Sequence, residues 1–285
     1  MIWCITYSDE HYADAKRLHV YSAKKYGGGD KIIPYGPEDI DNDFYEANKS
    51  ILNERKGNGY WLWKPYFIKK TLEKMSDNDY VCYSDAGVVY VNRVDYLVEF
   101  MKKHGLDILC FEMGLIESHY TKRDTFVLTD CDSPEYSNSK QRIGVLCVFR
   151  KCEKSCSFVD EWLKCGCDRR AITDDDNQLG LPNYEGFVAH RHDQSIFSLL
   201  TKKYGIQAYR DPSQFGNGRT HSEMDYPQIF FIHRNGHLKN WNSFKLYKFH
   251  CELHRKNKLY RSMYGLVGKL YRVYDKTRSR LMAHH

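Results

Sequence analysis

Residues 80–87 read Tyr-Val-Cys-Tyr-Ser-Asp-Ala-Gly, an apolar run that passes into an acidic residue and a glycine. The first four residues have the length and composition of a buried strand, and Asp85 stands just beyond its end. In an open α/β sheet, ligands bind beyond the carboxyl ends of the strands, so this carboxylate is a candidate ligand-binding group. An aspartate after a strand is also an ordinary turn residue, and the stretch alone leaves both interpretations open.

Strands and helices are predicted to alternate on both sides of this stretch. Residues 1–35 indicate strand, helix and strand, with Ser8 or Asp9 as the helix cap. The predicted order continues with a helix at 63–74, the strand at 80–83, a helix at 94–104, strands at 107–111 and 144–149, helices at 155–164 and 194–204, and a strand near 228–232. This alternation predicts an α/β fold. Residues 117–140 and 168–188 have no hydrophobic period and are predicted to be long irregular segments.

Length and composition limit the class of protein. The chain has 285 residues and a mass of 33.8 kDa, which suits one large domain or two small ones. A content of 42% hydrophobic and 28% charged residues excludes a disordered or fibrous protein. No apolar run reaches the roughly 18 residues of a membrane-spanning helix, and acidic residues at 9 and 10 interrupt a secretory signal, so we expect a cytoplasmic protein. The ten cysteines lack the paired spacing of a zinc ribbon, which favours reduced thiols.

The charge of the chain is distributed unevenly. The net charge is +6, but residues 245–285 contain 11 Lys or Arg and two acidic residues, which leaves residues 1–244 with a net charge of −3. A nucleic-acid-binding protein is therefore disfavoured, and no nucleic-acid recognition motif is present. We expect a body at 1–244 and a basic amphipathic helical tail at 245–285. The apolar stripe of that tail, from Leu259 to Tyr274, suits either peripheral contact with the anionic inner face of the cell membrane or packing on the body.

A second candidate site lies far along the chain. Residues 230–241 read Phe-Phe-Ile-His-Arg-Asn-Gly-His-Leu-Lys-Asn-Trp. A strand delivers His233, Gly236 allows a ligand to approach the backbone, and Lys239 supplies a cation, a set that suits a metal-bridged diphosphate. Here the sequence resembles the glycogenin and galactosyltransferase-like glycosyltransferases, which have the GT-A fold. The last motif of that family is His, two residues, Gly, two residues, Lys, one residue and Trp, and Trp241 completes the match.

Other stretches strengthen the resemblance. The family carries an Asp-Gln pair that opens a helix below the sugar site, and Asp193 and Gln194 stand here in the same chain order. Residues 144–149 look like the strand that precedes the acceptor region of the family. The resemblance covers the body of the chain and implies a GT-A, Rossmann-like fold with a mixed central sheet flanked by helices. In that fold, Tyr7 and Ser8 at the end of the first strand are placed to meet uracil and ribose.

One departure from the family concerns the metal. The family's metal motif is Asp-x-Asp, whereas this chain reads Asp85-Ala86-Gly87 and lacks the second carboxylate. In the interpretation that we favour, Asp85 and His233 hold Mn²⁺ or Mg²⁺ together with phosphate oxygens and water. The alternative is an enzyme that depends less on metal and relies on Lys and Arg.

Residues 55–66 read Arg-Lys-Gly-Asn-Gly-Tyr-Trp-Leu-Trp-Lys-Pro-Tyr and resemble a stretch of uncharacterised bacterial capsule and lipopolysaccharide glycosyltransferases. Aromatic faces stack on bases or sugar rings, and cations meet phosphates, so Arg55, Trp63 and Lys64 are predicted to contact the nucleotide. Core packing of Trp63 and a solvated surface position for Arg55 and Lys64 are the alternatives.

The resemblance implies a hexosyltransferase-type glycosyltransferase of polysaccharide biosynthesis. It would move a sugar from a nucleotide diphosphate sugar, most simply a UDP-sugar, to a surface polysaccharide such as capsule or lipopolysaccharide, or to a lipid-linked glycan. In this scheme Asp85 and His233 hold the metal ion, and Lys239 neutralises the leaving diphosphate. Asp193 and Gln194 face the donor sugar and the acceptor. The family implies retention of the anomeric configuration, whereas an inverting enzyme needs a base, for which Asp193 is the candidate.

Overall fold

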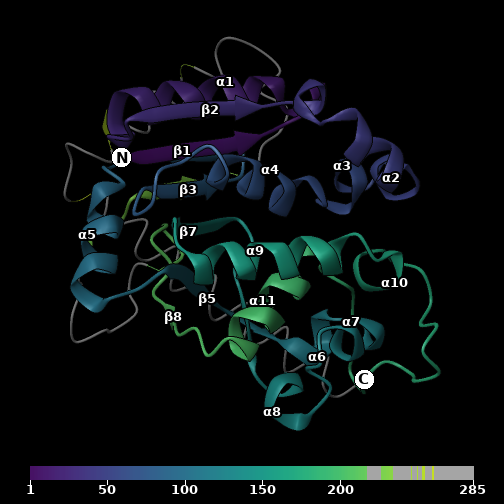
Figure 1. Cartoon of the computed structure of the whole chain (residues 1–285). Coiled ribbons are helices and arrows are strands. Elements are labelled where there is room, and N and C mark those ends of the chain that lie inside the picture. Colours follow the sequence, from purple (N-terminus) through teal and green to yellow (C-terminus); the bar gives the residue numbers. More distant parts are fainter. Residues whose placement is uncertain (217–225, 234–244, 246–248, 250–251, 254–258, 260–285) are drawn as a thin grey trace.

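The computed structural model describes residues 1–216 and 226–233, together with a few single positions between 245 and 259. Within these residues the chain forms a mixed central sheet with helices on both faces, and the predicted α/β fold is confirmed (Figure 1). Gly236 and Lys239 lie outside the described residues, as does the predicted basic helical tail apart from those single positions.

The elements follow the predicted alternation, but the helix at Asn42–Leu52 was not predicted from the sequence. The described strands are β1 (Ile2–Tyr7), β2 (Lys31–Tyr35), β3 (Tyr80–Ser84), β4 (Val88–Tyr90), β5 (Ile108–Ile116), β6 (Lys140–Arg142), β7 (Leu146–Arg150), β8 (Ala208–Tyr209) and β9 (Phe230–Ile232). The described α-helical segments are α1 (Ala13–Ser22), α2 (Asn42–Leu52), α3 (Gly57–Tyr60), α4 (Trp63–Leu72), α5 (Asp95–His104), α6 (Glu117–Tyr120), α7 (Arg123–Leu128), α8 (Pro134–Ser137), α9 (Glu153–Gly166), α10 (Arg169–Ile172) and α11 (Asp193–Lys203).

β1 lies at the centre of the parallel part of the sheet. The strand order is β2-β1-β3-β7-β5-β6, and β8 pairs with β5. β1 is parallel to β2, with Trp3 opposite Lys31, and parallel to β3, with Ile5 opposite Tyr83. β7 then runs antiparallel to β3. Because β2 and β3 lie on opposite sides of β1, the carboxyl ends of β1 and β3 flank a topological switch point, where α/β sheets bind ligands.

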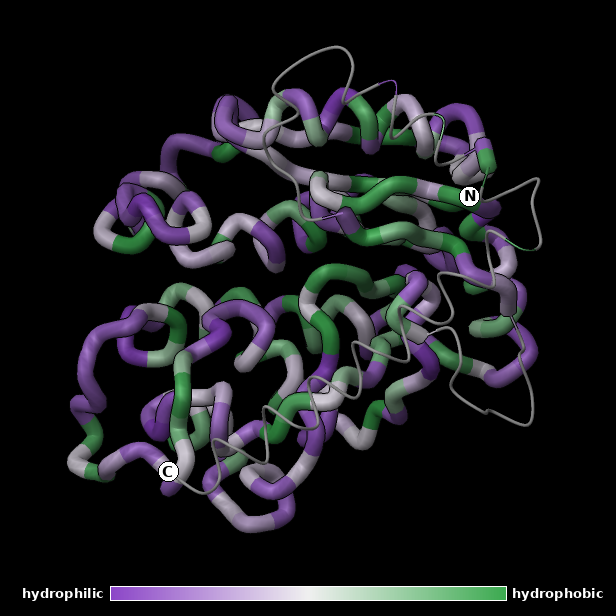
Figure 2. Tube along the Cα trace, turned by 180° about the vertical axis from the view of Figure 1, so that it is seen from behind, coloured by the Kyte–Doolittle hydropathy of each residue, from purple (hydrophilic) through white to green (hydrophobic). Residues whose placement is uncertain are grey.

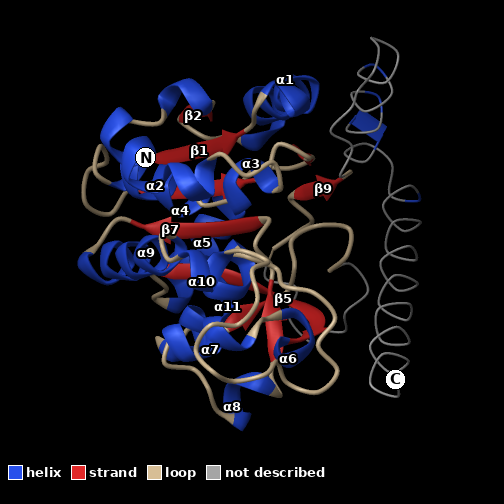
Figure 3. Cartoon of the chain, turned by 90° about the vertical axis from the view of Figure 1, so that its right-hand side faces the viewer, coloured by secondary structure: helices blue, strands red, loops and turns tan. Residues whose placement is uncertain are grey.

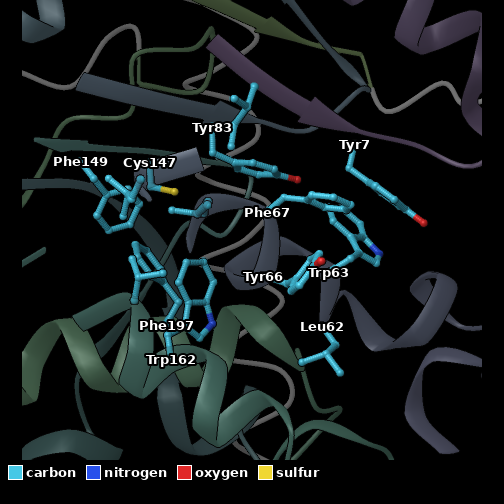
Figure 4. Packing of buried hydrophobic residues seen from close by; sticks show 14 of the residues in the cluster. Tyr7, Leu62, Trp63, Tyr66, Phe67, Tyr83, Cys147, Phe149, Trp162 and Phe197 are labelled. Carbon is cyan, nitrogen blue, oxygen red and sulfur yellow. The ribbon is translucent and has the colours of Figure 1, made fainter. Parts of the chain in front are cut away.

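Side chains alternate across the sheet and divide the core into two layers. Tyr83 of β3 points to the face covered by α4, α9 and α11, where it shares a buried cluster with Phe67, Trp162 and Phe197 (Figure 4). Cys82 points to the opposite face and packs in the cluster that includes α1 and α5. A strand covered on both faces is apolar at every position, which is why the strand that ends before Asp85 reads as a continuous apolar run. Figure 2 shows hydrophobic residues concentrated along the central strands.

A second, two-stranded sheet joins parts of the chain that are far apart in sequence. β4 and β9 pair antiparallel, with Val88 opposite Ile232 and Tyr90 opposite Phe230. Figure 3 shows β9 at the edge of the molecule, beside the central sheet. The short β9 therefore brings the end of the described body back to the segment that follows β3.

The prediction of a long loop at 117–140 is wrong. The structure places α6, α7 and α8 there, and α10 occupies part of the irregular segment predicted at 168–188. These helices are too short to show a hydrophobic period, and polar side chains hold the region together. The buried Asp124 accepts hydrogen bonds from the backbone N–H groups of Gln178 at 2.6 Å and Leu179 at 3.2 Å.

The cysteines and the helices agree with a chain folded around an apolar core. The nine described cysteines are free, and five of them are buried. None of the described helices is long and apolar enough to cross a membrane.

Candidate active site

A cavity of about 820 Å³ opens at the carboxyl ends of β1 and β3. It gathers most of the predicted site residues from separate parts of the chain. Those that line it are Tyr7, Ser8, Arg55, Trp63, Lys64, Asp85, Ala86, Gly87, Asp193 and Gln194. The cavity therefore lies at the switch point that the strand order creates, where a ligand is expected in such a sheet.

A buried ion pair forms one wall of the cavity. The Nζ atom of Lys64, in the first turn of α4, lies 2.5 Å from Oδ2 of Asp193, the first residue of α11. The same Nζ atom lies 3.7 Å from Oδ1 of Asp85 and donates to the backbone oxygen of Gly144 at 2.9 Å. The side chains of Lys64 and Asp193 are 3% and 5% exposed. The surface alternative for Lys64 is therefore wrong, and the single ammonium faces two carboxylates.

Burial and charge set the protonation of this group. Burial raises the pKa of Asp193 to about 6, although Lys64 opposes the shift. Burial by itself would lower the pKa of Lys64, but Asp193 and Asp85 outweigh it, so that pKa is raised. Lys64 is therefore charged, and Asp193 changes its protonation close to neutral pH. A buried carboxylate whose pKa is shifted toward neutrality, in a cavity, marks a candidate functional site.

Asp85 is held in place but remains accessible from the cavity. Its backbone N–H donates to the oxygen of Val145 at 3.1 Å, and the hydroxyl of Tyr83 donates to its carboxylate. The side chain is 29% exposed. Its position beyond the end of β3, rather than its residue type alone, makes this aspartate a ligand-binding candidate.

The two halves of the predicted metal site lie on neighbouring backbone segments. His233 follows β9, and its backbone N–H donates to the oxygen of Gly87 at 3.0 Å. Among the described residues there is no group of three or more His, Cys, Asp or Glu side chains that could hold a metal ion. The partly exposed carboxylate of Asp85 fits a divalent cation that takes its remaining ligands from phosphate and water.

Gln194 lines the cavity, but its amide is bonded within the protein. Its Oε1 atom accepts from the N–H of Gly144 at 3.1 Å, and its Nε2 atom donates to Oε1 of Gln141 at 3.0 Å. A Cβ atom at position 144 would lie 2.8 Å from Cβ of Gln194, so the close approach of these two segments requires a glycine there. Gln194 thus joins the start of α11 to the segment before β7.

Aromatic rings build the wall nearest β1. The ring of Tyr7 stacks on Trp63 at 4.0 Å and on Phe67 at 5.4 Å (Figure 4). Trp63 is buried, as its core-packing alternative predicts, and it also lines the cavity. The side-chain amide of Asn58 donates to the hydroxyl of Tyr7. Arg55 is exposed at the same wall, so it occupies a surface position that borders the cavity.

The segment before α4 has an unusual backbone that sequence patterns do not predict. Residues 57–61 all have positive φ, from 51° at Asn58 to 90° at Gly59, and the N–H of Tyr60 donates to the oxygen of Lys56 at 2.8 Å. These values describe one turn of left-handed helix, which costs about 1–2 kcal/mol for each residue other than glycine. Strain of this kind collects at functional sites. The sequence Gly-Asn-Gly at 57–59 is the one signal that could have indicated this left-handed turn.

The chain is similar to known proteins in its structure and not in its sequence. No family model and no curated protein matches the sequence. The chain is similar in structure to mouse xyloside xylosyltransferase 1, with a TM-score of 0.46, 10% identity, and coverage of 82% of this chain and 98% of that one. It is similar to the WbbM bifunctional glycosyltransferase, with a TM-score of 0.47, 10% identity, and coverage of 82% and 46%. It is also similar to an active-site mutant of LgtC, with a TM-score of 0.41, 12% identity, and coverage of 86% and 94%.

Proposed function

We propose that the chain is a glycosyltransferase that uses a UDP-linked sugar and a divalent cation, and that it transfers the sugar to a surface polysaccharide or a lipid-linked glycan. The observation that carries the proposal is the cavity at the β1–β3 switch point. It joins an aromatic wall, a strand-end carboxylate and a buried Lys–Asp pair within one space of about 820 Å³. That volume suits a ligand of the size of a nucleotide sugar.

The two sides of the cavity suit the two parts of such a donor. The side at the end of β1 offers Tyr7, Ser8 and Asn58, whose ring and polar atoms match a nucleoside. The side at the end of β3 offers Asp85, next to the buried pair formed by Lys64 and Asp193. The diphosphate would lie between them.

The chemistry that this site can supply is stabilisation of the leaving group. Asp85 and His233 would hold the cation, which when bound neutralises charge on the departing diphosphate. Arg55 borders the cavity and is exposed, so its guanidinium is available to a phosphate. Groups that are already in place for the developing charge lower the barrier without reorganisation during the reaction.

We infer retention of configuration, with Asp193 oriented toward the donor sugar. Lys64 holds the carboxylate of Asp193 in one position. A fixed carboxylate suits a constant contact with the donor sugar better than it suits a general base, which must take up and release a proton. An inverting mechanism is the second candidate, because a carboxylate with a pKa of about 6 suits a general base near neutral pH. Proton NMR of the first-formed product distinguishes the two through its anomeric configuration.

Calorimetric titration with UDP, with and without Mn²⁺, tests the proposal. We expect UDP to bind at least about tenfold more tightly with Mn²⁺, and Asp85→Asn to remove that gain. Asp43→Asn, on the exposed face of α2, is the matched control and should keep it. Release of UDP from UDP-sugars by the wild type, measured in parallel, tests the transferase activity. Absence of both UDP binding and UDP release would exclude the proposed function.

A further inference from the structure

Two strained turns meet at the wall of the cavity, and each leads directly into a helix that carries one partner of the buried pair. The first is the left-handed turn at 57–61, which ends shortly before α4 and Lys64. The second is at His192, which immediately precedes Asp193 and α11 and has φ 54° and ψ −122°. The starts of the two helices are therefore set by unusual backbone.

His192 occupies a position that ordinarily takes glycine. The N–H of Gln194 donates to the oxygen of Arg191 at 3.0 Å and closes a four-residue turn. The backbone angles of His192 are those of the second residue of a type II′ turn, where glycine, asparagine and aspartate dominate. A histidine persists in such a conformation only where its surroundings over-determine it.

The surroundings of the His192 ring supply that constraint from two directions. Its Nδ1 atom lies 2.8 Å from the backbone oxygen of Ile172 at the end of α10. The ring stacks on the indole of Trp61 at 5.4 Å and 21°, and its centroid lies 4.9 Å from that of the Tyr60 ring. The imidazole is buried between α10 and the left-handed turn.

We propose that His192 is a positioning residue, whose ring locks the two strained turns together and thereby sets the separation of Lys64 and Asp193. The geometry makes the connection short. Lys64 is the third residue after Trp61, and Asp193 directly follows His192. A displacement of either turn moves the start of its helix, and the 2.5 Å contact between Nζ and Oδ2 has no slack to absorb it.

His192→Gly is the sharpest variant, because glycine adopts the same backbone angles without strain while the ring contacts are lost. The proposal rests on the proposed function for its kinetic test. We expect kcat for hydrolysis of the donor UDP-sugar to fall at least about tenfold, and the affinity for UDP to change less than about threefold. Asn78→Gly, at another positive φ and at the amino end of β3 away from the cavity, is the control and should leave kcat unchanged.

A double-mutant cycle tests whether His192 acts through the pair. In an Asp193→Asn background the pair is already lost, so His192→Gly should then lower kcat by less than about twofold. A loss of the same size in both backgrounds would show that the ring acts separately and would overturn the proposal. Wild-type kcat in His192→Gly alone would overturn it as well.

Crystal structures of the wild type and of His192→Gly provide a test that does not depend on activity. We expect the Nζ–Oδ2 distance between Lys64 and Asp193 to lengthen beyond hydrogen-bonding range in the variant. An unchanged pair in the variant would overturn the positioning role. Should the wild type turn over no nucleotide sugar, the proposed function fails, while these two structures still decide what His192 does.

Discussion

At the scale of single residues, the decisive feature is one ammonium shared by two carboxylates. Lys64 lies 2.5 Å from Asp193 and 3.7 Å from Asp85, and all three side chains line the cavity. Leaving a buried charge without its partner is costly, so each of these residues constrains the chemistry of the other two. Burial raises the pKa of Asp193 to about 6, so its protonation changes close to neutral pH.

We predict that Asp193→Asn lowers kcat for sugar transfer by at least about a hundredfold, with little change in the affinity for UDP. The reason is that Asp193 contacts Lys64 on the side of the cavity at the end of β3, where the sugar would lie, whereas the nucleoside would lie against Tyr7 and Ser8 at the end of β1. Steady-state kinetics and UDP titration measure the two effects separately.

The pH profile provides the control for this prediction. In the wild type, kcat should decline as the pH falls below about 6, because Asp193 then takes up a proton. The Asn variant should lack that decline. Wild-type turnover in the variant would reduce Asp193 to the first residue of α11.

At the scale of elements, the left-handed turn at 57–61 depends on its glycines. Gly59 has φ 90°, and a Cβ atom there would lie 2.7 Å from Cα of Leu52 in α2. Gly59→Ala should therefore lower the free energy of unfolding by more than the roughly 1–2 kcal/mol of the backbone term alone. Urea unfolding measures the loss.

Gly105→Ala is the matched control for that variant. Gly105 caps α5 with φ 64°, and a Cβ atom there would meet nothing within 4 Å. Gly105→Ala should therefore lower the free energy of unfolding by the cost of the left-handed backbone alone, because no atom lies close to the added Cβ. Equal losses in the two variants would contradict the role of the α2 contact.

A buried histidine fastens α1 to β4 and makes the fold sensitive to acid. Nδ1 of His19 lies 2.8 Å from the oxygen of Val88, and burial lowers the pKa of His19 to about 4. Between pH 6.5 and 4, the unfolded chain therefore binds a proton at His19 that the folded chain does not. As the pH is lowered through that window, the free energy of unfolding decreases, by at most about 3 kcal/mol for this group.

We predict that His19→Gln reduces the slope of unfolding free energy against pH between 6.5 and 4. His192, whose pKa is also lowered to about 4 by burial, keeps part of the slope in the variant. Urea unfolding at a series of pH values tests this, and an unchanged slope would contradict it.

At the scale of the whole molecule, the charges of the body and of residues 245–285 are opposite in sign. We predict that truncation after His250 leaves hydrolysis of the donor sugar nearly intact and abolishes sedimentation with anionic vesicles. Attraction of about 1 kcal/mol for each basic residue near an anionic surface gives the reason.

The competing hypothesis for residues 245–285 makes the opposite forecast. If they pack on the body, truncation should unfold or aggregate the protein, and the full chain should not sediment with anionic vesicles at physiological salt. Analytical size exclusion of the truncated protein, together with the sedimentation assay, distinguishes the two.

The sequence by itself determined the fold class and the strand-end position of Asp85. Periodicity and apolar runs report local structure and burial, so β1, β3, β7 and the longer helices other than α2 could be predicted from them. The short helices at 117–140 could not be predicted in this way. They are stabilised by side-chain hydrogen bonds such as those of Asp124, and they are too short to show a hydrophobic stripe.

Only the tertiary structure decided how the site is assembled. The sequence left Lys64 as a phosphate contact or a surface cation, whereas the fold buries it between Asp85 and Asp193, which are 108 residues apart in the chain. The positive φ angles of Tyr60, Trp61 and His192 could not be predicted from propensity, because their cost is offset by contacts between segments that meet only after folding. Local sequence specifies which elements form, and long-range packing specifies which of their side chains share a cavity.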